Sequence, residues 1–300
     1  MEAMPLVLYL HGGGFIIGTR FTHRALTAGF ARRGLQVLSI DYRRMPGHVY
    51  PAQLSDSYSA LVYALKDLMI PHSEIIVAGD SAGGNLAYSL AMYIRDNKPE
   101  DTPAGLILIT PWVDLTSSSP TIILGDEFDW DVLAVGDKQQ NTQQRLIRHV
   151  KDYSGMTSPT HPSISPIYDT GNISVPIFQT VGTVDRLYAE NLLLYQKRIA
   201  ESAGFQQQLY IFKEKVHDFQ MIPSKATTLA LDLQVQFVKD VMSGKGTKSG
   251  AHEVGVDNKT ITSITDEDVR KRLAGLVNRA EIKDGMYFMP FSTSSSKLEH

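Results

Sequence analysis

The 300-residue chain contains no cysteine, so disulfide bonds, thiolate metal sites and a cysteine nucleophile are all excluded. It also lacks a large excess of charge of either sign, because 29 basic and 32 acidic residues leave a net charge of −3. No basic stripe with interleaved aromatic residues is present, and without one there is no electrostatic footprint for nucleic acid. We therefore expect no nucleic-acid partner and no disulfide framework.

Long apolar runs are missing as well. No stretch approaches the roughly 20 apolar residues that a membrane-spanning helix needs, and residues 1–10 lack the basic region and the small-residue cleavage site of a secretory signal. We therefore expect no membrane span and a cytoplasmic location. Residues 297–300, Lys-Leu-Glu-His, are typical of a histidine-tag remnant and do not enter the fold prediction.

What is present is the composition of a globular protein, 43% hydrophobic and 20% charged, with strand-type and helix-type segments in alternation. We expect strands at 6–10, 36–40, 75–79, 105–109, 176–181 and 208–212. We expect helices at about 23–33, from 55 onward, and at about 85–96, 187–203 and 225–242. This alternation predicts an α/β fold in which helices cover both faces of a mostly parallel sheet.

Two segments interrupt the alternation. Residues from about 114 to 166 contain one helix-type stretch, at 138–152, and no convincing strand. We predict that this segment is an insertion that folds over the strand ends as a cap. Residues 243–250 are rich in Ser, Gly and Lys, which is the composition of a linker.

Residues 75–84, Ile-Ile-Val-Ala-Gly-Asp-Ser-Ala-Gly-Gly, join an apolar strand to a helix-type segment through a Gly-x-Ser-x-Gly motif. A strand that turns abruptly into a helix holds the residue at the turn in a strained conformation, with its side chain above the sheet edge. Gly79 and Gly83 are where a side chain would collide with the neighbouring strand and helix. Ser81 stands at a helix N-terminus, which favours negative charge, and it is the predicted nucleophile.

A serine hydroxyl near neutral pH needs an adjacent base, itself oriented by an acid, to act as a nucleophile. In the strand–turn–helix arrangement the acid and then the histidine follow the serine, each in a loop after a later strand. Asp185 and His217 each follow a predicted strand, so both are at the same end of the sheet as Ser81. We predict Asp185 as the acid and His217 as the base.

Other acidic residues are close to these positions in the sequence. Asp218 adjoins the base, and Glu190 lies one helical turn beyond Asp185. Asp80 is next to the serine but would point away from it. Asp185 is therefore the best choice, while His217 is selected because the other histidines lie in no suitable loop after a strand.

Gly12, Gly13 and Gly14 directly follow the first predicted strand. Acyl transfer passes through a tetrahedral oxyanion that needs preorganised donors, and glycine lets backbone amides approach it closely. We expect an oxyanion hole in which Gly12 shapes the turn and the amides of Gly13, Gly14 and Ala82 are the donors.

Four motifs stand out together. They are His11-Gly12-Gly13-Gly14-Phe15, Asp41-Tyr42-Arg43, Gly79-Asp80-Ser81-Ala82-Gly83-Gly84 and His217-Asp218-Phe219. In this combination the chain resembles the hormone-sensitive-lipase-like family of α/β-hydrolases over about residues 5–242. The resemblance implies a carboxylic ester hydrolase with a Ser-His-Asp triad, a small-molecule ester as substrate, and no cofactor or metal. It also implies a cap, built partly from the N-terminus and partly from the insertion, that shapes the acyl pocket.

The chain departs from the family pattern at three places, one of which is the stretch 43–48, where Leu-Ala-Pro-Glu is commoner. Residues 185–190 are Asp-Arg-Leu-Tyr-Ala-Glu, where the family usually has Asp-Pro-Leu-x-Asp-Glu. Only ten residues precede the glycine loop, where family members carry two strands and a cap helix. An unpaired sheet edge is an aggregation liability. We therefore expect a catalytic domain at 1–242 and an extension at 243–296, with the extension or a homodimer contact covering the exposed edge or the shortened cap.

The leading prediction is ester hydrolysis through an acyl-enzyme, on short-acyl or bulky esters because a thinner cap leaves a more open pocket. Lactone or amide hydrolysis, acyl transfer and a biosynthetic ring-forming step would use the same triad and stay open. A ligand-binding protein without catalysis is an alternative from a different class, since a fold does not fix a function.

Overall fold

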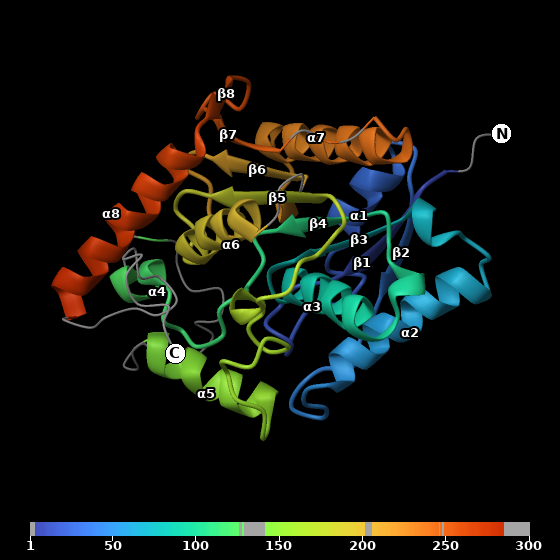
Figure 1. Cartoon of the computed structure of the whole chain (residues 1–300), viewed down its shortest axis with the longest axis horizontal. Coiled ribbons are helices and arrows are strands. Elements are labelled where there is room, and N and C mark those ends of the chain that lie inside the picture. The colour runs from blue at the N-terminus through green and yellow to red at the C-terminus, as the bar shows by residue number, and fades with distance from the viewer. Residues whose placement is uncertain are drawn as a thin grey trace.

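The computed structural model describes residues 4–125, 128, 142–201, 206–245, 247 and 249–284. One eight-stranded sheet runs through the molecule in the order β2-β1-β3-β4-β5-β6-β7-β8 (Figure 1). The strands are β1 (Leu6–Leu10), β2 (Gln36–Ile40), β3 (Ile75–Asp80), β4 (Gly105–Ile109), β5 (Ile177–Gly182), β6 (Gln207–Phe212), β7 (Gly250–Val254) and β8 (Ile261–Ile264). Every neighbouring pair is parallel except β7 and β8. The predicted parallel α/β sheet is confirmed, and its six predicted strands are β1 to β6.

Helices cover both faces of this sheet. The α-helices are α1 (Arg24–Ala31), α2 (Ala52–Lys66), α3 (Ser81–Asn97), α4 (Pro120–Leu124), α5 (Thr142–Ser154), α6 (Tyr188–Glu201), α7 (Lys225–Met242) and α8 (Asp266–Asp284). Short 3-10 helices are η1 (His72–Glu74), η2 (Pro99–Asp101), η4 (Pro166–Tyr168) and η5 (Phe219–Met221). Figure 1 shows α1 and α7 on one face and α2, α3 and α6 on the other. No helix in the described ranges has both the length and the apolar character needed to cross a lipid bilayer.

The period of two along each strand divides the core into two layers. In β1, Leu6, Leu8 and Leu10 pack on the side of α2 and α3, whereas Val7 and Tyr9 pack on the side of α1 and α7. All five residues are buried. A strand buried on both faces is apolar throughout, which is why β1 is recognisable in the sequence as an uninterrupted apolar run.

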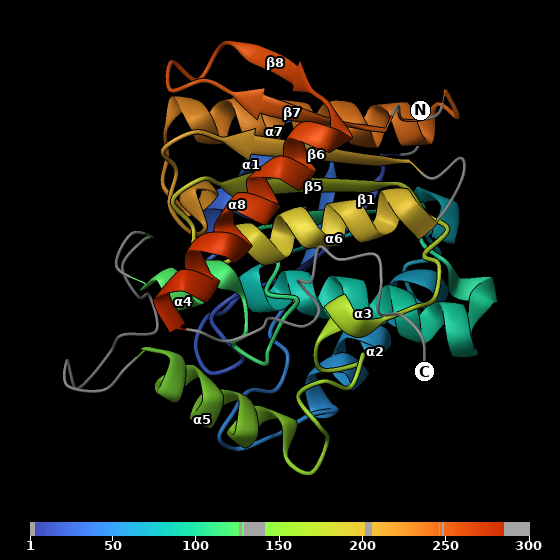
Figure 2. The same cartoon turned by 60° about the vertical axis from the view of Figure 1, so that its left-hand side comes forward.

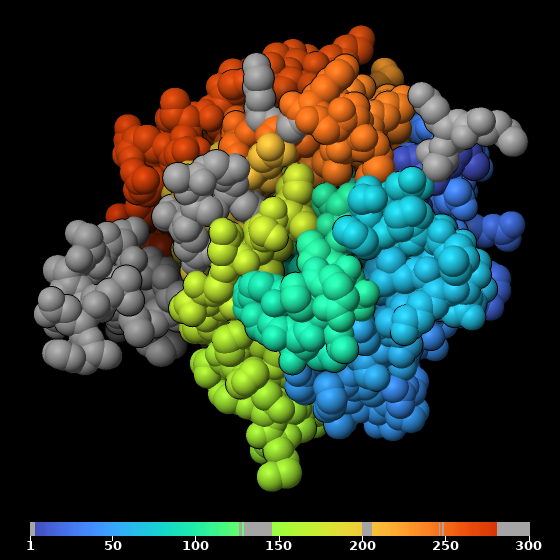
Figure 3. All heavy atoms as spheres, turned by 45° about the vertical axis from the view of Figure 1, so that its right-hand side comes forward, coloured from blue at the N-terminus to red at the C-terminus, as the bar shows by residue number. Residues whose placement is uncertain are grey.

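The insertion predicted at about 114–166 contains α4 and α5. The helix expected at 138–152 corresponds to α5, although the first four residues of that stretch lie outside the described part of the chain. Tyr153 of α5 is buried and stacks on Phe15, with ring centroids 3.8 Å apart. Its carbonyl oxygen accepts a hydrogen bond from the Tyr50 amide at 2.9 Å. The insertion therefore packs on the loops after β1 and β2, and Figure 3 shows its yellow-green surface against the blue surface of the N-terminal region.

The C-terminal extension adds β7 and β8 beyond β6, at the edge of the sheet opposite β2. β7 pairs with β6, and β8 pairs with β7, while β2 has no partner on its outer side in the described part of the chain. α8 lies against α6 and α4, so the extension reaches the insertion (Figure 2). Among the described residues the extension therefore lies against the insertion, one of the two places where we expected a cover, and not at the β2 edge. Cover of the β2 edge by a homodimer stays a prediction.

The two C-terminal strands were not predicted, and residues 243–250 were interpreted as a linker up to the start of β7. Only Ala251 and Val254 of β7 are buried, and no residue of β8 is. Strands at the edge of a sheet have a partly solvated face, so they lack the continuous apolar run of the central strands.

Candidate active site

The turn between β3 and α3 is abrupt. β3 ends at Asp80 and α3 begins at Ser81, four residues earlier than predicted, and Ser81 has a φ of 51°. A non-glycine residue adopts this left-handed conformation only where its surroundings impose it. A Cβ on Gly79 would lie 2.3 Å from the Gly83 carbonyl oxygen, and a Cβ on Gly83 would lie 2.0 Å from the Leu10 carbonyl oxygen. Glycine is required at both positions, so that strand and helix can approach and present Ser81 between them.

Two side chains from later loops meet Ser81. The Nε2 atom of His217 lies 2.9 Å from Ser81 Oγ, and its Nδ1 atom lies 3.2 and 3.1 Å from the two carboxylate oxygens of Asp185. Asp185 is fully buried, and its Oδ1 also accepts the Leu187 amide at 2.8 Å, which fixes the carboxylate. The side chain of His217 is 14% exposed. The structure therefore brings Ser81, His217 and Asp185 into one hydrogen-bonded chain.

The alternative acids occupy different places. Glu190 uses its Oε1 to accept the amides of Val113 at 2.7 Å and Asp114 at 3.1 Å, and burial raises its pKa well above the ordinary value. Glu190 thus holds the loop after β4. Asp218 does approach His217, but its Oδ2 lies 3.2 Å from Nε2, the nitrogen that faces the serine.

The three amides of the glycine loop have different surroundings. The Gly12 amide donates to both carboxylate oxygens of Asp80, at 3.0 Å each, so it is not available to an oxyanion. Gly13 and Gly14 have φ values of 107° and 59°, and their amides donate to no acceptor in the part of the chain that the structure describes. Ala82 is buried and second in α3, where helix amides have no intrahelical partner. Gly12 therefore shapes the loop, whereas the amides of Gly13, Gly14 and Ala82 are available as donors to an oxyanion.

A buried ionic cluster behind the turn was missed by the sequence analysis. Besides the Gly12 amide, Asp80 accepts the Tyr9 hydroxyl at 2.5 Å and lies 3.1 Å from His23 Nε2. Burial alone would raise the pKa of Asp80, but the charge and hydrogen bond of His23, together with the hydrogen bonds of Tyr9 and Gly12, lower it. Burial likewise opposes a charge on His23, yet Asp80 raises the pKa of His23. The cluster ties β1, the glycine loop and the start of α1 to the residue that precedes Ser81.

The insertion supplies one more residue that no sequence argument selected. His149 of α5 donates from Nε2 to the Gly14 carbonyl oxygen at 2.5 Å, and burial lowers the pKa of His149. Its ring centroid is 5.7 Å from that of Trp112, whose backbone amide donates to the Ser81 carbonyl oxygen at 3.0 Å. α5 is therefore held against both loops that surround the serine.

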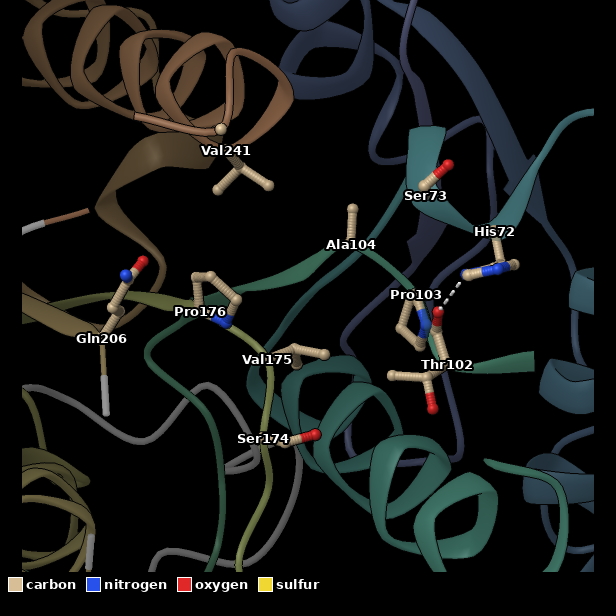
Figure 4. Close-up of a pocket in the computed structure, with 11 residues that line it drawn as sticks. His72, Ser73, Thr102, Pro103, Ala104, Ser174, Val175, Pro176, Gln206 and Val241 are labelled. Carbon is tan, nitrogen blue, oxygen red and sulfur yellow. Dashed lines mark hydrogen bonds between the residues drawn. The ribbon is translucent and has the colours of Figure 1, made fainter. Parts of the chain in front are cut away.

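A hollow of about 540 Å³ lies elsewhere (Figure 4). Its lining includes His72, Ser73, Ala104, Pro176 and Gln206. These residues precede β3 to β6, and because the strands are parallel they share the amino edge of the sheet, opposite the edge that carries Ser81. The ring of His72 points to the Thr102 carbonyl oxygen, to which Nδ1 donates at 2.9 Å. The hollow is separate from the cluster around the serine.

The carboxyl edge therefore combines three chemical capacities. Ser81 offers a hydroxyl nucleophile, His217 offers a base, and Gly13 and Gly14 offer amide donors. Such a set can attack an acyl carbon and stabilise the oxyanion that forms. The described residues contain no cluster of three or more His, Asp or Glu side chains that could hold a metal ion.

Comparison with known proteins identifies the fold family of the chain and relatives with esterase names. A family model described as an alpha/beta hydrolase fold matches residues 7–221. An esterase of Acinetobacter venetianus is 31% identical over 221 residues, which are 73% of this chain and 69% of the esterase. An acetyl-hydrolase of Streptomyces hygroscopicus is 31% identical over 193 residues, which are 63% of this chain and 60% of the relative.

Solved esterase structures have the same architecture. An esterase from the bacterial hormone-sensitive lipase family superimposes with a TM-score of 0.67 at 28% identity, over 79% of this chain and 77% of that chain. The esterase EstE5, in a crystal soaked with p-nitrophenyl butyrate, superimposes with a TM-score of 0.70 at 26% identity, over 81% of this chain and 78% of that chain. The likeness thus covers most of both chains in each pair.

Proposed function

The chain belongs to the α/β hydrolase family, and we propose that it is a carboxylic ester hydrolase that acts through an acyl-enzyme on Ser81. The observation that carries this proposal is the chain of hydrogen bonds from Ser81 Oγ through His217 to Asp185. The relatives and the solved neighbours are esterases and an acetyl-hydrolase, which supports the same class of reaction.

In the acylation step, Ser81 Oγ attacks the ester carbonyl carbon and its proton passes to His217 Nε2. The Nδ1–H of the imidazole donates to Asp185, which fixes the tautomer with a lone pair on Nε2 and stabilises the imidazolium that forms. When the tetrahedral intermediate collapses, the imidazolium gives the proton to the leaving alcohol. The acyl group remains on Ser81.

The oxyanion of this intermediate is stabilised by backbone amides. Gly13, Gly14 and Ala82 supply the donors, whereas the Gly12 amide is bound by Asp80. Loss of one donor in comparable sites costs about 3 kcal/mol of transition-state stabilisation. In the deacylation step, a water molecule replaces the alcohol, His217 removes its proton, and the acid is released by the reverse collapse.

We propose small to medium esters, with a short acyl chain or a bulky group, as substrates. Ile16, Ile17 and Phe21 follow the glycine loop and are 41%, 50% and 64% exposed, so they offer an apolar surface to the hydrocarbon part of an ester. The stacked rings of Phe15 and Tyr153 fill the space between this loop and α5, which favours a short chain. Rates with p-nitrophenyl acetate, butyrate and decanoate test this preference, which is wrong if decanoate is hydrolysed fastest.

The proposal is tested by hydrolysis of p-nitrophenyl butyrate by the wild type and by Ser81→Ala. Removal of the nucleophile is expected to lower kcat by about 10⁴-fold or more, since the triad acts as a unit. Ser73→Ala is the matched control, because Ser73 is exposed at the opposite edge of the sheet and should leave kcat unchanged. Stoichiometric labelling of Ser81 by a p-nitrophenyl phosphonate, read by peptide mass, gives a second measurement. Ester hydrolysis that survives in Ser81→Ala would overturn the proposal.

A further inference from the structure

His217 has a second carboxyl neighbour that the triad does not use. Asp218 Oδ2 lies 3.2 Å from His217 Nε2, and the same nitrogen lies 2.9 Å from Ser81 Oγ. The other oxygen of Asp218, Oδ1, is buried and has no hydrogen-bond partner among the described residues. The backbone of Asp218 is left-handed, with φ 48° and ψ 35°.

The short distance between these two atoms favours a proton on one of them. A carboxylate oxygen and an unprotonated imidazole nitrogen are both acceptors, and two acceptors at hydrogen-bond distance repel each other unless one of them carries hydrogen. A proton on Nε2 makes an imidazolium that pairs with the carboxylate of Asp218. The lone pair of Nε2 is then occupied and cannot accept the proton of Ser81.

We infer that Asp218 and His217 share a proton on the serine side of the imidazole, so that Asp218 sets the pH at which the enzyme becomes active. Asp218 is a positioning residue in this scheme, since it acts through His217 and not on the substrate. The inference rests on the proposed function, because it takes His217 as the base. For catalysis the pair must release one proton to solvent, after which Nε2 can accept the proton of Ser81.

The surroundings of Asp218 favour retention of that proton. Its titratable neighbours are Tyr9 on β1, His23 at the start of α1, Asp80 at the end of β3 and Asp185 after β5, with His217 adjacent in the chain. Burial raises the pKa of Asp218, the charges of Asp80 and Asp185 raise it further, and His217 and His23 oppose them. Two buried carboxylates thus face Asp218 without a hydrogen bond to it, so that a third negative charge here is costly.

The decisive variant is Asp218→Asn. Asparagine has nearly the same shape and tolerates the left-handed backbone, but it cannot hold a titrating proton. In wild type the acid limb of kcat/KM is expected at a higher pH than in the variant, since the shared proton must leave first. In Asp218→Asn the acid limb should move down by about one pH unit. At a pH on that limb, kcat/KM divided by the plateau value of the same enzyme should then be about tenfold higher in the variant than in wild type.

The experiment measures kcat/KM for p-nitrophenyl butyrate from about pH 5 to about pH 10, a range that spans the acid limb of a histidine base. Asp218→Gly, which also accepts the positive φ, is the second variant and should move the limb in the same direction. Asp232→Asn is the matched control, because Asp232 is an exposed carboxylate paired with Arg33 on the surface. Its acid limb should coincide with that of wild type.

A direct readout on the unmodified protein completes the test. In ¹⁵N-histidine NMR, the Nε2 of His217 should stay protonated or hydrogen-bonded to a proton well above the ordinary histidine pKa of about 6.5. An acid limb that is identical in wild type and Asp218→Asn, or an Nε2 that titrates at the ordinary value, overturns the inference and leaves the esterase assignment intact. Absence of ester hydrolysis by the wild type would instead overturn the proposed function.

Discussion

The two edges of the parallel sheet differ in physical character. The carboxyl edge holds buried charge at Asp80 and Asp185 and left-handed backbone at Ser81. The amino edge holds the 540 Å³ hollow, whose lining contains no acidic or basic side chain apart from the exposed His72. Strained backbone and buried charge cost stability, and they persist where function requires them. The hollow at the amino edge has neither strained backbone nor buried charge in its lining. The candidate active site is therefore identified by its chemical groups and not by the volume of a cavity.

The largest contrast between the edges is expected from their histidines. His217→Asn removes the base and should lower kcat by about 10⁴-fold or more, and the double variant with Ser81→Ala should lose no more than either single one. His72→Asn, at the amino edge, should change kcat by less than about twofold. Steady-state hydrolysis of p-nitrophenyl butyrate measures both. Comparable losses at the two edges would contradict the comparison.

A smaller contrast is expected from glycines at the two edges. A Cβ on Gly12 would lie 2.1 Å from Asp80 Oδ2, and that carboxylate cannot give way because Tyr9 and His23 hold it. Gly12→Ala should therefore displace the glycine loop and lower kcat about 100-fold, which corresponds to the loss of one oxyanion donor. A Cβ on Gly105, at the amino edge, would lie 3.1 Å from the Pro176 carbonyl oxygen, so that a shift of a few tenths of an ångström suffices.

Gly105→Ala is accordingly the matched control for Gly12→Ala. It should leave kcat nearly unchanged while the urea midpoint moves modestly in either direction. If Gly12→Ala retained full kcat, the close contact between the glycine loop and Asp80 would not be what positions the oxyanion donors.

The smallest effect is expected from pH-dependent stability of the buried ion pair. The folded pKa of Asp80 is lowered, so its contribution is present above the unfolded value of about 3.9 and is lost as pH falls through the folded value. The folded pKa of His23 is raised, so its contribution is present below about 6.5 and is lost as pH rises through the folded value. The pair therefore stabilises the fold most between about pH 4 and about pH 6.5.

Urea denaturation of His23→Gln at pH values inside and above this window tests the pair. The variant should lose about 1.5–3 kcal/mol of unfolding free energy near pH 6, as for a hydrogen bond to a charged group, and less near pH 9. His72→Gln, on the other edge, should show no such difference between the two pH values. A loss that is equal at both pH values would mean that His23 is neutral in the folded protein.

Much of the fold follows from the sequence because burial has a simple signature. β1, β3, β4 and β5 are buried along their whole length, and the glycines at 79 and 83 mark the turn that presents Ser81. β7 and β8 were not predicted because polar, half-buried residues such as His252 and Glu253 interrupt the apolar run. Period and composition detect a buried strand better than an edge strand.

The parts of the candidate site that could not be predicted depend on contacts between distant residues. His23 and Asp80 are 57 positions apart, and nothing in either segment indicates that the other lies beside it. The sequence also does not reveal that the Gly12 amide donates to Asp80, because this bond depends on the position of the Asp80 side chain. Asp218 was visible as a neighbour of His217, but the sequence does not reveal that its carboxylate lies beside Nε2.

The hydrogen bond from His149 to the Gly14 carbonyl has a consequence for chimeras between relatives. α5 contacts the loop that carries the proposed oxyanion donors both through this bond and through the stacking of Tyr153 on Phe15. An insertion transplanted from another hydrolase to alter substrate range would remove both contacts and leave the recipient's loop unsupported. Residues 149 and 153 would have to be exchanged together with their partners at 14 and 15. The insertion and the glycine loop therefore have to be transferred as one unit.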